Sequence, residues 1–183
     1  LDGCVLGVIG AGDFARSVLL PQLKKMRAVT LHTVATQSGA SAERTKDTFG
    51  FLQATTDVNT LLKNPDINAI LIATRHDSHA DFCTRALIAE KNVLVEKPLA
   101  LNRNDINRVI DAREKSNSFF QVGFNRRYAP LSQMIRMHVA QQKGTKFILI
   151  RINAGYIPAE NWVHDTDKGG GRILGEVCHF VDL

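Results

Sequence analysis

The feature that most restricts the fold of this chain is a glycine-containing turn between two apolar segments. The run Cys4–Ile9 has the length of a buried strand, and Phe14–Met26 has the apolar spacing of a helix. The turn between them is Gly10-Ala11-Gly12-Asp13-Phe14-Ala15. A strand, a glycine turn of this spacing and a helix in direct succession are typical of a phosphate-binding turn.

The residue types in this turn suit the approach of a pyrophosphate. Gly10 permits a tight turn, Gly12 leaves the backbone open to the phosphates, and Ala15 allows the helix to pack closely on the strand. Backbone amides at the start of the helix, including that of Phe14, would then meet the phosphates. We expect Asp13 to cap the helix and point away from them. The alternative is an ordinary glycine turn in an α/β protein.

Apolar runs of strand length alternate with amphipathic segments along most of the chain. The further expected strands are Val29–Ala35, Ala69–Ala73, Val93–Val95 and Phe119–Val122. The further expected helices are Ala40–Phe49, Val58–Leu62, His79–Glu90 and Asp105–Lys115. This alternation predicts an α/β fold with a doubly wound parallel sheet of the Rossmann type.

The alternation changes near Gly123, where we place a domain boundary. The expected elements that follow are a helix at Leu131–Gln142, a long strand at Lys146–Ile157 and a helical pattern over Ile173–Leu183. We therefore expect a dinucleotide-binding domain at residues 1–124 and the beginning of an α+β domain at residues 125–183. Both ends of the sequence resemble the interior of a longer polypeptide.

Composition and charge narrow the classes of function. The net charge is +5, but Lys and Arg are scattered among acidic residues, which favours solvated helix faces over a nucleic-acid groove. No apolar run has the roughly 18 residues needed to span a membrane, and no signal peptide is seen, so cytoplasm is the expected compartment. The cysteines Cys4, Cys83 and Cys178 are far apart and predict neither disulfides nor a zinc site.

The choice between NAD and NADP depends on the residues after the second expected strand. An acidic residue there would favour NAD through the ribose 2′-hydroxyl. This chain has Thr36, Gln37 and Ser38, which can hydrogen-bond either cofactor, and Arg44 follows in the next helix. We expect NAD or NADP, with a slight preference for NADP. The alternative is that these are solvated loop residues.

Several further motifs occur in a fixed order after the glycine turn. They are Ala73-Thr74-Arg75-His76-Asp77-Ser78-His79, Glu96-Lys97-Pro98-Leu99-Ala100, Gly123-Phe124-Asn125-Arg126-Arg127-Tyr128, and Gly169-Gly170-Gly171 leading to His179. This succession resembles the Gfo/Idh/MocA family of nicotinamide-dependent sugar and polyol oxidoreductases. The resemblance implies a Rossmann domain followed by a mostly antiparallel sheet domain, with hydride transfer to or from a sugar or cyclitol in the cleft between them.

The resemblance implies Lys97 and His179 as catalytic residues. Lys97 follows a buried strand, where an ammonium can stabilise negative charge on a substrate oxygen, and His179 has the titration range of an acid/base. The family pattern has an Asp four residues before this His, and this chain has Gly175 there. Glu176 is the expected third member, with a structural carboxylate as the alternative. The resemblance also implies a cis peptide bond before Pro98.

Other candidates surround the expected cofactor and substrate. For the cofactor they are Thr74, Arg75, His76, His79, Glu96 and Lys97, with a structural role as the alternative for His79. For the substrate they are Lys97, Arg126, Tyr128, Trp162 and His179, with packing between the domains as the alternative for Arg126 and Tyr128. His164-Asp165 lacks further ligands, so no metal is expected.

The leading hypothesis is an NAD(P)-dependent oxidoreductase acting on a sugar, a cyclitol or a related hydroxy or keto compound. The alternatives are a non-catalytic nucleotide-binding module and a Rossmann domain for another nucleotide. Exposed edge strands favour association, so a homo-oligomer is expected. The run Gly171–Phe180 also resembles modules fused to a zinc-dependent alcohol-dehydrogenase-like segment, which would be a further partner within the parent chain.

Overall fold

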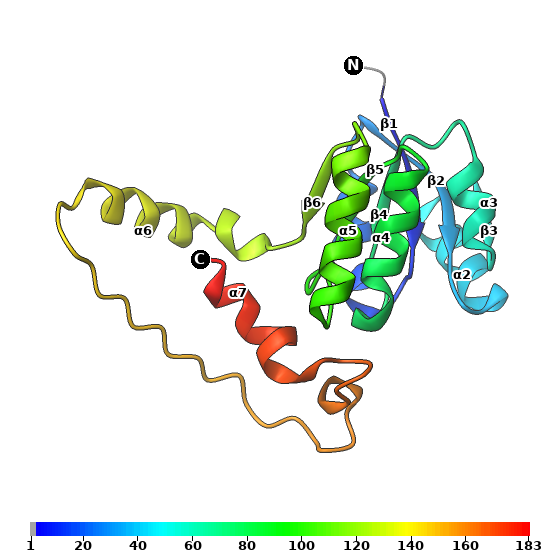
Figure 1. Ribbon diagram of the computed structural model, residues 1–183. Helices are drawn as coiled ribbons and strands as arrows, with labels where there is room; N and C mark the ends of the chain where they lie inside the picture. The colour runs from blue at the N-terminus through cyan, green and yellow to red at the C-terminus, as the bar shows by residue number, and fades with distance from the viewer. Residues whose placement is uncertain (1–2) are drawn as a thin grey trace.

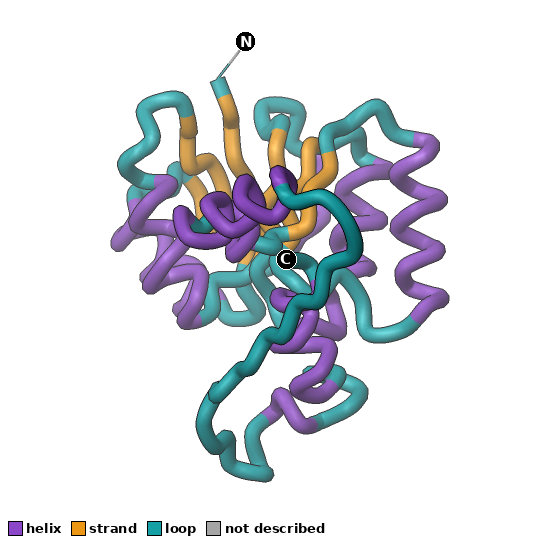
Figure 2. Tube along the Cα trace, turned by 90° about the vertical axis from the view of Figure 1, so that its left-hand side faces the viewer, coloured by secondary structure: helices purple, strands orange, loops and turns teal. Residues whose placement is uncertain are grey.

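The computed structural model, which describes residues 3–183, is built on a six-stranded sheet (Figures 1 and 2). All neighbouring strands are parallel, and their order is β3-β2-β1-β4-β5-β6. The strands are β1 (Cys4–Ile9), β2 (Val29–Ala35), β3 (Gln53–Thr55), β4 (Ala69–Ile72), β5 (Asn92–Val95) and β6 (Phe120–Val122). This is the strand order of a dinucleotide-binding Rossmann sheet, as the alternating pattern predicts.

The helices follow the strands as expected, with shifted ends. They are α1 (Leu20–Leu23), which continues a π-helical segment at Ala15–Leu19, α2 (Gly39–Phe49), α3 (Val58–Lys63), α4 (His79–Ile88), α5 (Arg103–Lys115), α6 (Pro130–Gln141) and α7 (Cys178–Val181), which continues a π-helical segment at Ile173–Val177. Short polar side chains cap several of them. Asp57 accepts the amide of Asn59 at the start of α3, and Asn102 accepts that of Asp105 at the start of α5.

The two faces of the sheet carry separate hydrophobic clusters. On β4, Ile70 and Ile72 pack into the cluster that includes α3, α4 and α5, whereas Leu71 packs into the cluster that includes Leu20 of α1. Successive side chains of a strand point to opposite faces, so a strand that is apolar throughout must be covered on both. Figure 2 shows the strands as a layer with helices on either side.

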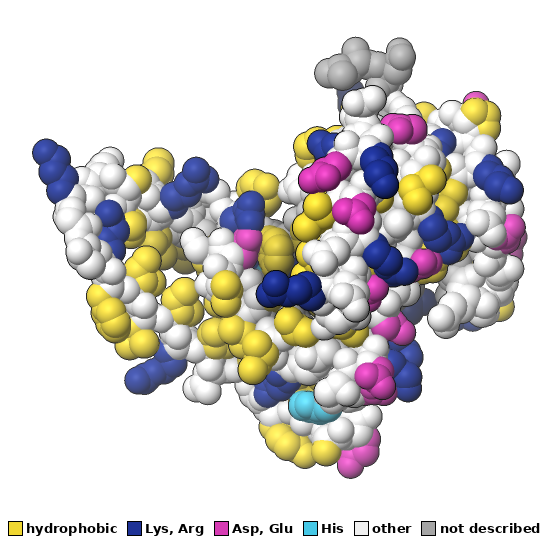
Figure 3. Space-filling model, in the orientation of Figure 1, with side chains coloured by type: hydrophobic (Ala, Val, Ile, Leu, Met, Phe, Trp, Pro, Cys, Tyr) yellow, Lys and Arg dark blue, Asp and Glu magenta, His cyan; other side chains and the backbone are white. Residues whose placement is uncertain are grey.

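The segment expected as a strand at 146–157 is extended but unpaired, so this prediction is wrong for the described chain. A strand is stabilised by a neighbouring strand that takes up its backbone N–H and C=O groups, and no strand among the described residues pairs with this segment. Its apolar side chains are accordingly open, with Phe147 90% and Leu149 76% exposed. Figure 3 shows hydrophobic side chains gathered on α6 and along this segment.

One strand was missed, and one smaller prediction is wrong. The edge strand β3, whose residues are Gln53, Ala54 and Thr55, was not expected, because it is short and has no apolar run. Asp13 does not cap the first helix, since its carboxylate accepts a hydrogen bond from Arg16 at 3.0 Å instead. The pairing of β3 with β2 and the contact of Asp13 with Arg16 cannot be predicted from hydrophobic periodicity.

Lys91, directly before β5, is a buried charged residue that joins two loops. It is 8% exposed, and its Nζ donates to the carbonyl oxygens of Asn64 and Ile67 at 2.8 and 2.7 Å. Lys91→Met leaves the Ile67 oxygen without its donor and the Asn64 oxygen with only the amide of Ile67 at 3.4 Å, so we expect the free energy of unfolding to fall by about 1–3 kcal/mol in urea denaturation. Lys25→Met, at an exposed turn, is the control and should change it by less than about 0.5 kcal/mol. An equal loss in both variants would contradict this assignment.

No helix among residues 3–183 combines the length and the apolar character needed to cross a membrane.

Candidate active site

The candidate site lies at the carboxyl edge of the sheet. β1 has β2 on one side and β4 on the other. The chain adds β2 and β3 on one side of β1 and then returns to add β4, β5 and β6 on the other side, so the strand order reverses at β1. Ligands of open α/β sheets bind in the crevice at such a switch point. The loops that follow β1, β4 and β5 bring the glycine turn, the Thr74–His79 segment and Lys97 to this edge.

The glycine turn has the geometry of a phosphate cradle. Gly10 has φ +89°, and a Cβ there would lie 2.6 Å from the carbonyl oxygen of Ala73. Its amide donates to the carbonyl oxygen of Ala35 at 2.8 Å, which fixes the turn against β2. At Gly12 a Cβ would meet no atom within 4 Å, so this backbone is open on its outer side. Ala15 is buried, while Phe14 is exposed.

The residues expected to select the ribose are held in a small loop after β2. The Thr36 hydroxyl donates to the carbonyl oxygen of Ser38 at 2.8 Å. The Ser38 hydroxyl accepts the amide of Ser41 and caps α2. Gln37 is exposed between them. The loop therefore presents neutral polar groups and no carboxylate.

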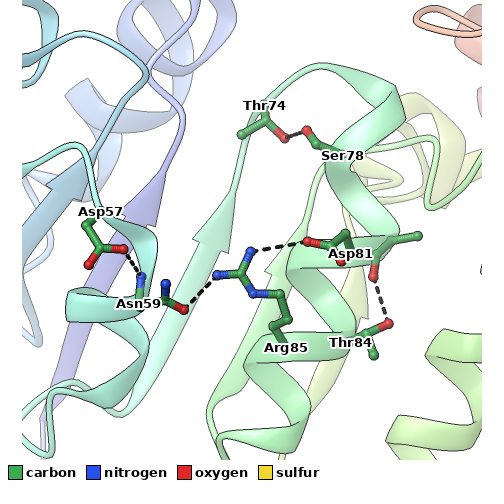
Figure 4. Close-up of polar contacts among 8 residues, drawn as sticks. Asp57, Asn59, Thr74, Ser78, Asp81, Thr84 and Arg85 are labelled. Atoms are coloured by element: carbon green, nitrogen blue, oxygen red, sulfur yellow. Dashed lines mark hydrogen bonds and ion pairs between the residues drawn. The ribbon is translucent and has the colours of Figure 1, made fainter.

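The loop after β4 is closed by its own hydroxyl groups. Ser78 Oγ donates to Thr74 Oγ1 at 2.7 Å, and Figure 4 shows this contact above α4. The same figure shows Arg85 of α4, which donates to Asn59 of α3 and to Asp81 within α4. The loop after β4 is thus held by its own hydroxyl contacts, and α4 is joined to α3 by Arg85.

His79 lies beneath this loop rather than in the open edge. It is 1% exposed, and its ring nitrogens lie 2.7 Å from the carbonyl oxygen of Pro98 and 3.2 Å from that of Thr74. Burial lowers the pKa of its imidazole. The side chain ties two loops together, as the structural alternative for this residue describes.

Lys97 extends from the end of β5 toward the C-terminal segment. The Lys97–Pro98 peptide bond is cis, as the resemblance implies. Lys97 Nζ donates to the carbonyl oxygen of Gly175 at 2.6 Å. The neighbouring Glu96 is half-buried beside Gly123, and burial raises the pKa of its carboxyl group.

His179 lies at the start of α7 with a polar atom unused. Burial lowers the pKa of its imidazole to about 4, and the positive charges of Lys97 and Arg126 act in the same direction. Its Nδ1 is buried and has no hydrogen-bond partner among residues 3–183. The ring of Phe124 lies edge-on to it, with centroids 6.3 Å apart. A neutral imidazole at this place can accept a proton.

A pocket of about 470 Å³ combines these groups. Its walls come from the end of β5, from the extended segment after α6 and from the C-terminal helix. They are formed by Lys97, Arg126, Arg151, Ile152, Asn153, Ala154, Glu176, His179 and Phe180. The pocket therefore brings together Lys97, His179, Glu176 and Arg126, which the sequence nominates separately.

The comparisons with known proteins agree with this geometry. The model of the Gfo/Idh/MocA oxidoreductase family, described as an NAD-binding Rossmann fold, matches residues 5–124. The chain belongs to this family. A myo-inositol 2-dehydrogenase from Thermotoga maritima is 28% identical, over 97% of this chain and 53% of that protein. A 1-carboxy-3-chloro-3,4-dihydroxycyclohexa-1,5-diene dehydrogenase from Comamonas testosteroni is 29% identical, over 97% and 46%.

The fold of this Gfo/Idh/MocA chain is also found in solved structures. A 3-ketoreductase from Actinomadura kijaniata, in complex with TDP-benzene and NADP, superposes with a TM-score of 0.70 and 25% sequence identity. The match covers 76% of this chain and 44% of that one. The chain spans about half the length of the curated relatives it matches.

Within this family member, Glu176 takes a different partner from the one expected. Its carboxylate pairs with Arg172, one helical turn earlier, at 3.0 Å. His179 Nδ1 has no such contact. The carboxylate lines the pocket, and the ion pair holds it there.

Two expected substrate residues lie outside the pocket wall. Tyr128 is exposed, and its hydroxyl accepts a hydrogen bond from Gln121 Nε2 at 3.1 Å. Trp162 packs edge-on against His76 and lies under Arg75, whose guanidinium carbon is 5.9 Å from the ring centroid. Tyr128 and Trp162 therefore do not line the pocket in this structure.

The sequence did not nominate Phe180 or the pocket residues 151–154. Phe180 follows His179 directly and stacks beneath Arg126, with 4.8 Å between the guanidinium carbon and the ring centroid. Residues 151–154 were assigned to a strand, so no signal marked them as pocket residues. Among residues 3–183 no group of three potential ligands lies close enough to hold a metal ion.

Proposed function

We propose that this protein is an NAD(P)-dependent oxidoreductase that transfers hydride between a nicotinamide cofactor and a sugar, a cyclitol or a related hydroxy or keto compound. The observation that carries the proposal is the pocket lined by Lys97 and His179 beside the edge of the sheet where the glycine turn lies. The named activities of the relatives, myo-inositol 2-dehydrogenase and 1,5-anhydro-D-fructose reductase, support this substrate class.

The proposed chemistry divides between two side chains. The bound nicotinamide would supply the hydride acceptor or donor. His179, neutral at pH 7 because its pKa is lowered to about 4, accepts the proton of the substrate hydroxyl. The Lys97 ammonium donates a hydrogen bond to the same oxygen and stabilises the negative charge that develops there. Arg126, on the same pocket wall, adds positive charge around that oxygen.

The residues of the sheet edge fit the proposed cofactor. The open backbone at Gly12 and the amides around Asp13 and Phe14 would hold the pyrophosphate. Thr36, Gln37 and Ser38 would meet the ribose. Since none of these three is acidic, a 2′-phosphate is not repelled, and we retain the slight preference for NADP. The NADP complex of the Actinomadura kijaniata reductase supports this choice.

Cofactor binding tests the proposal first. Trp162 is the only tryptophan in this sequence, so quenching of its fluorescence by NADH and NADPH reports binding. Tighter binding of NADPH is the expected result. Absence of binding by both reduced cofactors would overturn the proposal.

Turnover separates the enzyme from the second candidate function. A panel of inositols, anhydro sugars and ketosugars, followed by nicotinamide absorbance, should identify at least one substrate. A protein that binds the cofactor but oxidises and reduces none of them would be the non-catalytic module, which the Gly175 departure favours. The substrate assays use the full-length protein, because this chain spans about half of its relatives.

Glu176 is the third proposed member of the catalytic site, and its contact defines a limited role. Because its carboxylate is paired with Arg172 and not with His179, we expect Glu176→Gln to reduce kcat only a few-fold. The measurement is steady-state turnover on the substrate found in the panel. Arg172→Gln, which breaks the same pair from the other side, should give a similar change. A loss of 100-fold or more in Glu176→Gln alone, of the order that general acid–base catalysis contributes, would instead make Glu176 a proton-transfer residue.

The proposal also covers organisation and location. We assign residues 1–124 to the cofactor domain and residues 125–183 to the beginning of an α+β domain, supported by the exposed apolar side chains after α6.

A homo-oligomer would cover such surfaces, and light scattering of the full-length protein tests it. A fused zinc-dehydrogenase-like module would be seen in the mass of the parent polypeptide. The three cysteines are free thiols, which supports a cytoplasmic location.

A further inference from the structure

His76 is fixed from two sides although it lies in the loop after β4. Its Nδ1 donates to the carbonyl oxygen of Gly169 at 2.8 Å, across 93 residues of sequence. Its ring also meets the ring of Trp162 edge-on, with centroids 4.9 Å apart. Only 9% of the residue is exposed. The imidazole is therefore held in place between the Rossmann sheet and the C-terminal segment.

The backbone of Gly175 packs directly against the His76 ring. A Cβ at position 175 would lie 3.2 Å from Cε1 of His76 and 3.5 Å from Cγ2 of Val163. The first distance is tighter than an ordinary contact, whereas the second is ordinary van der Waals contact. His76 thus limits how closely the turn around Gly175 approaches the sheet, and glycine permits the approach that is seen.

The same turn carries the acceptor for Lys97. The carbonyl oxygen of Gly175 receives the hydrogen bond from Lys97 Nζ at 2.6 Å, across 78 residues of sequence. The ammonium group is the flexible end of a long side chain, so its place in the pocket depends on where this oxygen is held. The contacts run from Trp162 through His76 and Gly175 to the reacting end of Lys97.

We propose that His76 is a positioning residue. It limits how closely the backbone at Gly175 approaches the sheet and, through the Gly175 carbonyl oxygen, places the ammonium group of Lys97 in the pocket. The inference rests on the proposed function, in which Lys97 contacts the substrate oxygen. Burial lowers the pKa of His76, so its ring is neutral at pH 7 and adds no charge beside the ammonium. Its part is steric and hydrogen-bonding.

Crowding at position 175 tests the proposal. Gly175→Ala places a methyl group 3.2 Å from Cε1 of His76, so one of the two must give by a few tenths of an ångström. Because His76 is held by Gly169 and Trp162, we expect the backbone at Gly175 and its carbonyl oxygen to shift. We expect kcat to fall roughly ten- to hundredfold, since small misplacements of a catalytic group have effects of this order. Cofactor binding should be unchanged, because Gly175 is not part of the phosphate turn.

A second substitution identifies the residue that causes the effect. In the Gly175→Ala background, His76→Asn gives the methyl group room and retains an amide donor for Gly169, so kcat should recover by at least about fivefold. Val163→Ala is the matched control, because its contact with the methyl group is already ordinary, and it should give no recovery. Wild-type kcat in Gly175→Ala, or equal recovery with both second substitutions, would overturn the proposal.

A readout without turnover keeps the inference separate from the proposed function. The rate at which an amine reagent labels Lys97, measured by peptide mass spectrometry, should rise in Gly175→Ala and return toward the wild-type rate with His76→Asn. Equal labelling rates in all variants would overturn the positioning role. If no substrate is turned over, the proposed function fails while this labelling experiment still decides whether His76 places Lys97. Thermal denaturation of each variant verifies that it is folded.

Discussion

Replacement of Lys97 with Met is expected to lower kcat by about 10²–10³-fold, the usual loss when one donor to a developing oxyanion is removed. Met has a similar length but no ammonium group, so the substrate oxygen loses its hydrogen bond and nearby positive charge. The carbonyl oxygen of Gly175 loses its donor at the same time. Steady-state kinetics on the substrate found in the panel measures the change. Titration with NADPH measures separately any part that Lys97 takes in cofactor binding.

The same variant has a consequence for pH dependence. Burial and the charge of Lys97 both hold the pKa of His179 down, to about 4 against an ordinary value of 6.5. Without the Lys97 charge the imidazolium is less disfavoured, so the pKa of His179 rises. The acid limb of kcat/KM therefore moves to higher pH, and activity is lost sooner on acidification.

Lys143→Met is the control for both effects, because Lys143 is exposed after α6 and does not line the pocket. It should leave kcat and the acid limb unchanged. Wild-type kcat in Lys97→Met would remove Lys97 from the chemistry. An unshifted acid limb would separate the titration of His179 from the charge of Lys97.

The sheet could be predicted from sequence because buried parallel strands have a direct signature. β1 and β2 are where the apolar runs place them, since both faces of these strands are covered by helices. β3 has no such run, and its pairing with β2 is decided by neighbouring backbone. The segment at 146–157 has the apolar pattern but no partner strand among the described residues, so pattern alone was insufficient there.

The candidate site could be predicted where the proposed chemistry depends on side chains. Lys97 and His179 stand in motifs whose order is distinctive, and the structure brings both to one pocket. The acceptor of Lys97 is a backbone oxygen, which every residue has and which no sequence position marks. The partner of Glu176 could not be predicted either, because His179 and Arg172 lie about one turn away on opposite sides of it, and only packing selects between them.

The second large effect is expected at Gly12. A Cβ there meets no protein atom within 4 Å, so Gly12→Ala should fold with a free energy of unfolding close to that of the wild type. The methyl group would instead occupy the space through which a pyrophosphate approaches the backbone. We expect the Kd for NADPH to rise roughly ten- to hundredfold, since one hydrogen bond to a charged group contributes about 1.5–3 kcal/mol. Fluorescence titration and urea denaturation measure the two quantities.

Gly10→Ala is the matched comparison, and it should affect both quantities. Its φ of +89° costs a side-chain-bearing residue about 1–2 kcal/mol. The added Cβ would also lie 2.6 Å from the carbonyl oxygen of Ala73, so the turn must move. Loss of stability together with loss of binding at Gly10, and loss of binding alone at Gly12, separates a glycine required by the fold from one required by a ligand. Unchanged NADPH binding in Gly12→Ala would show that the phosphates do not approach this backbone.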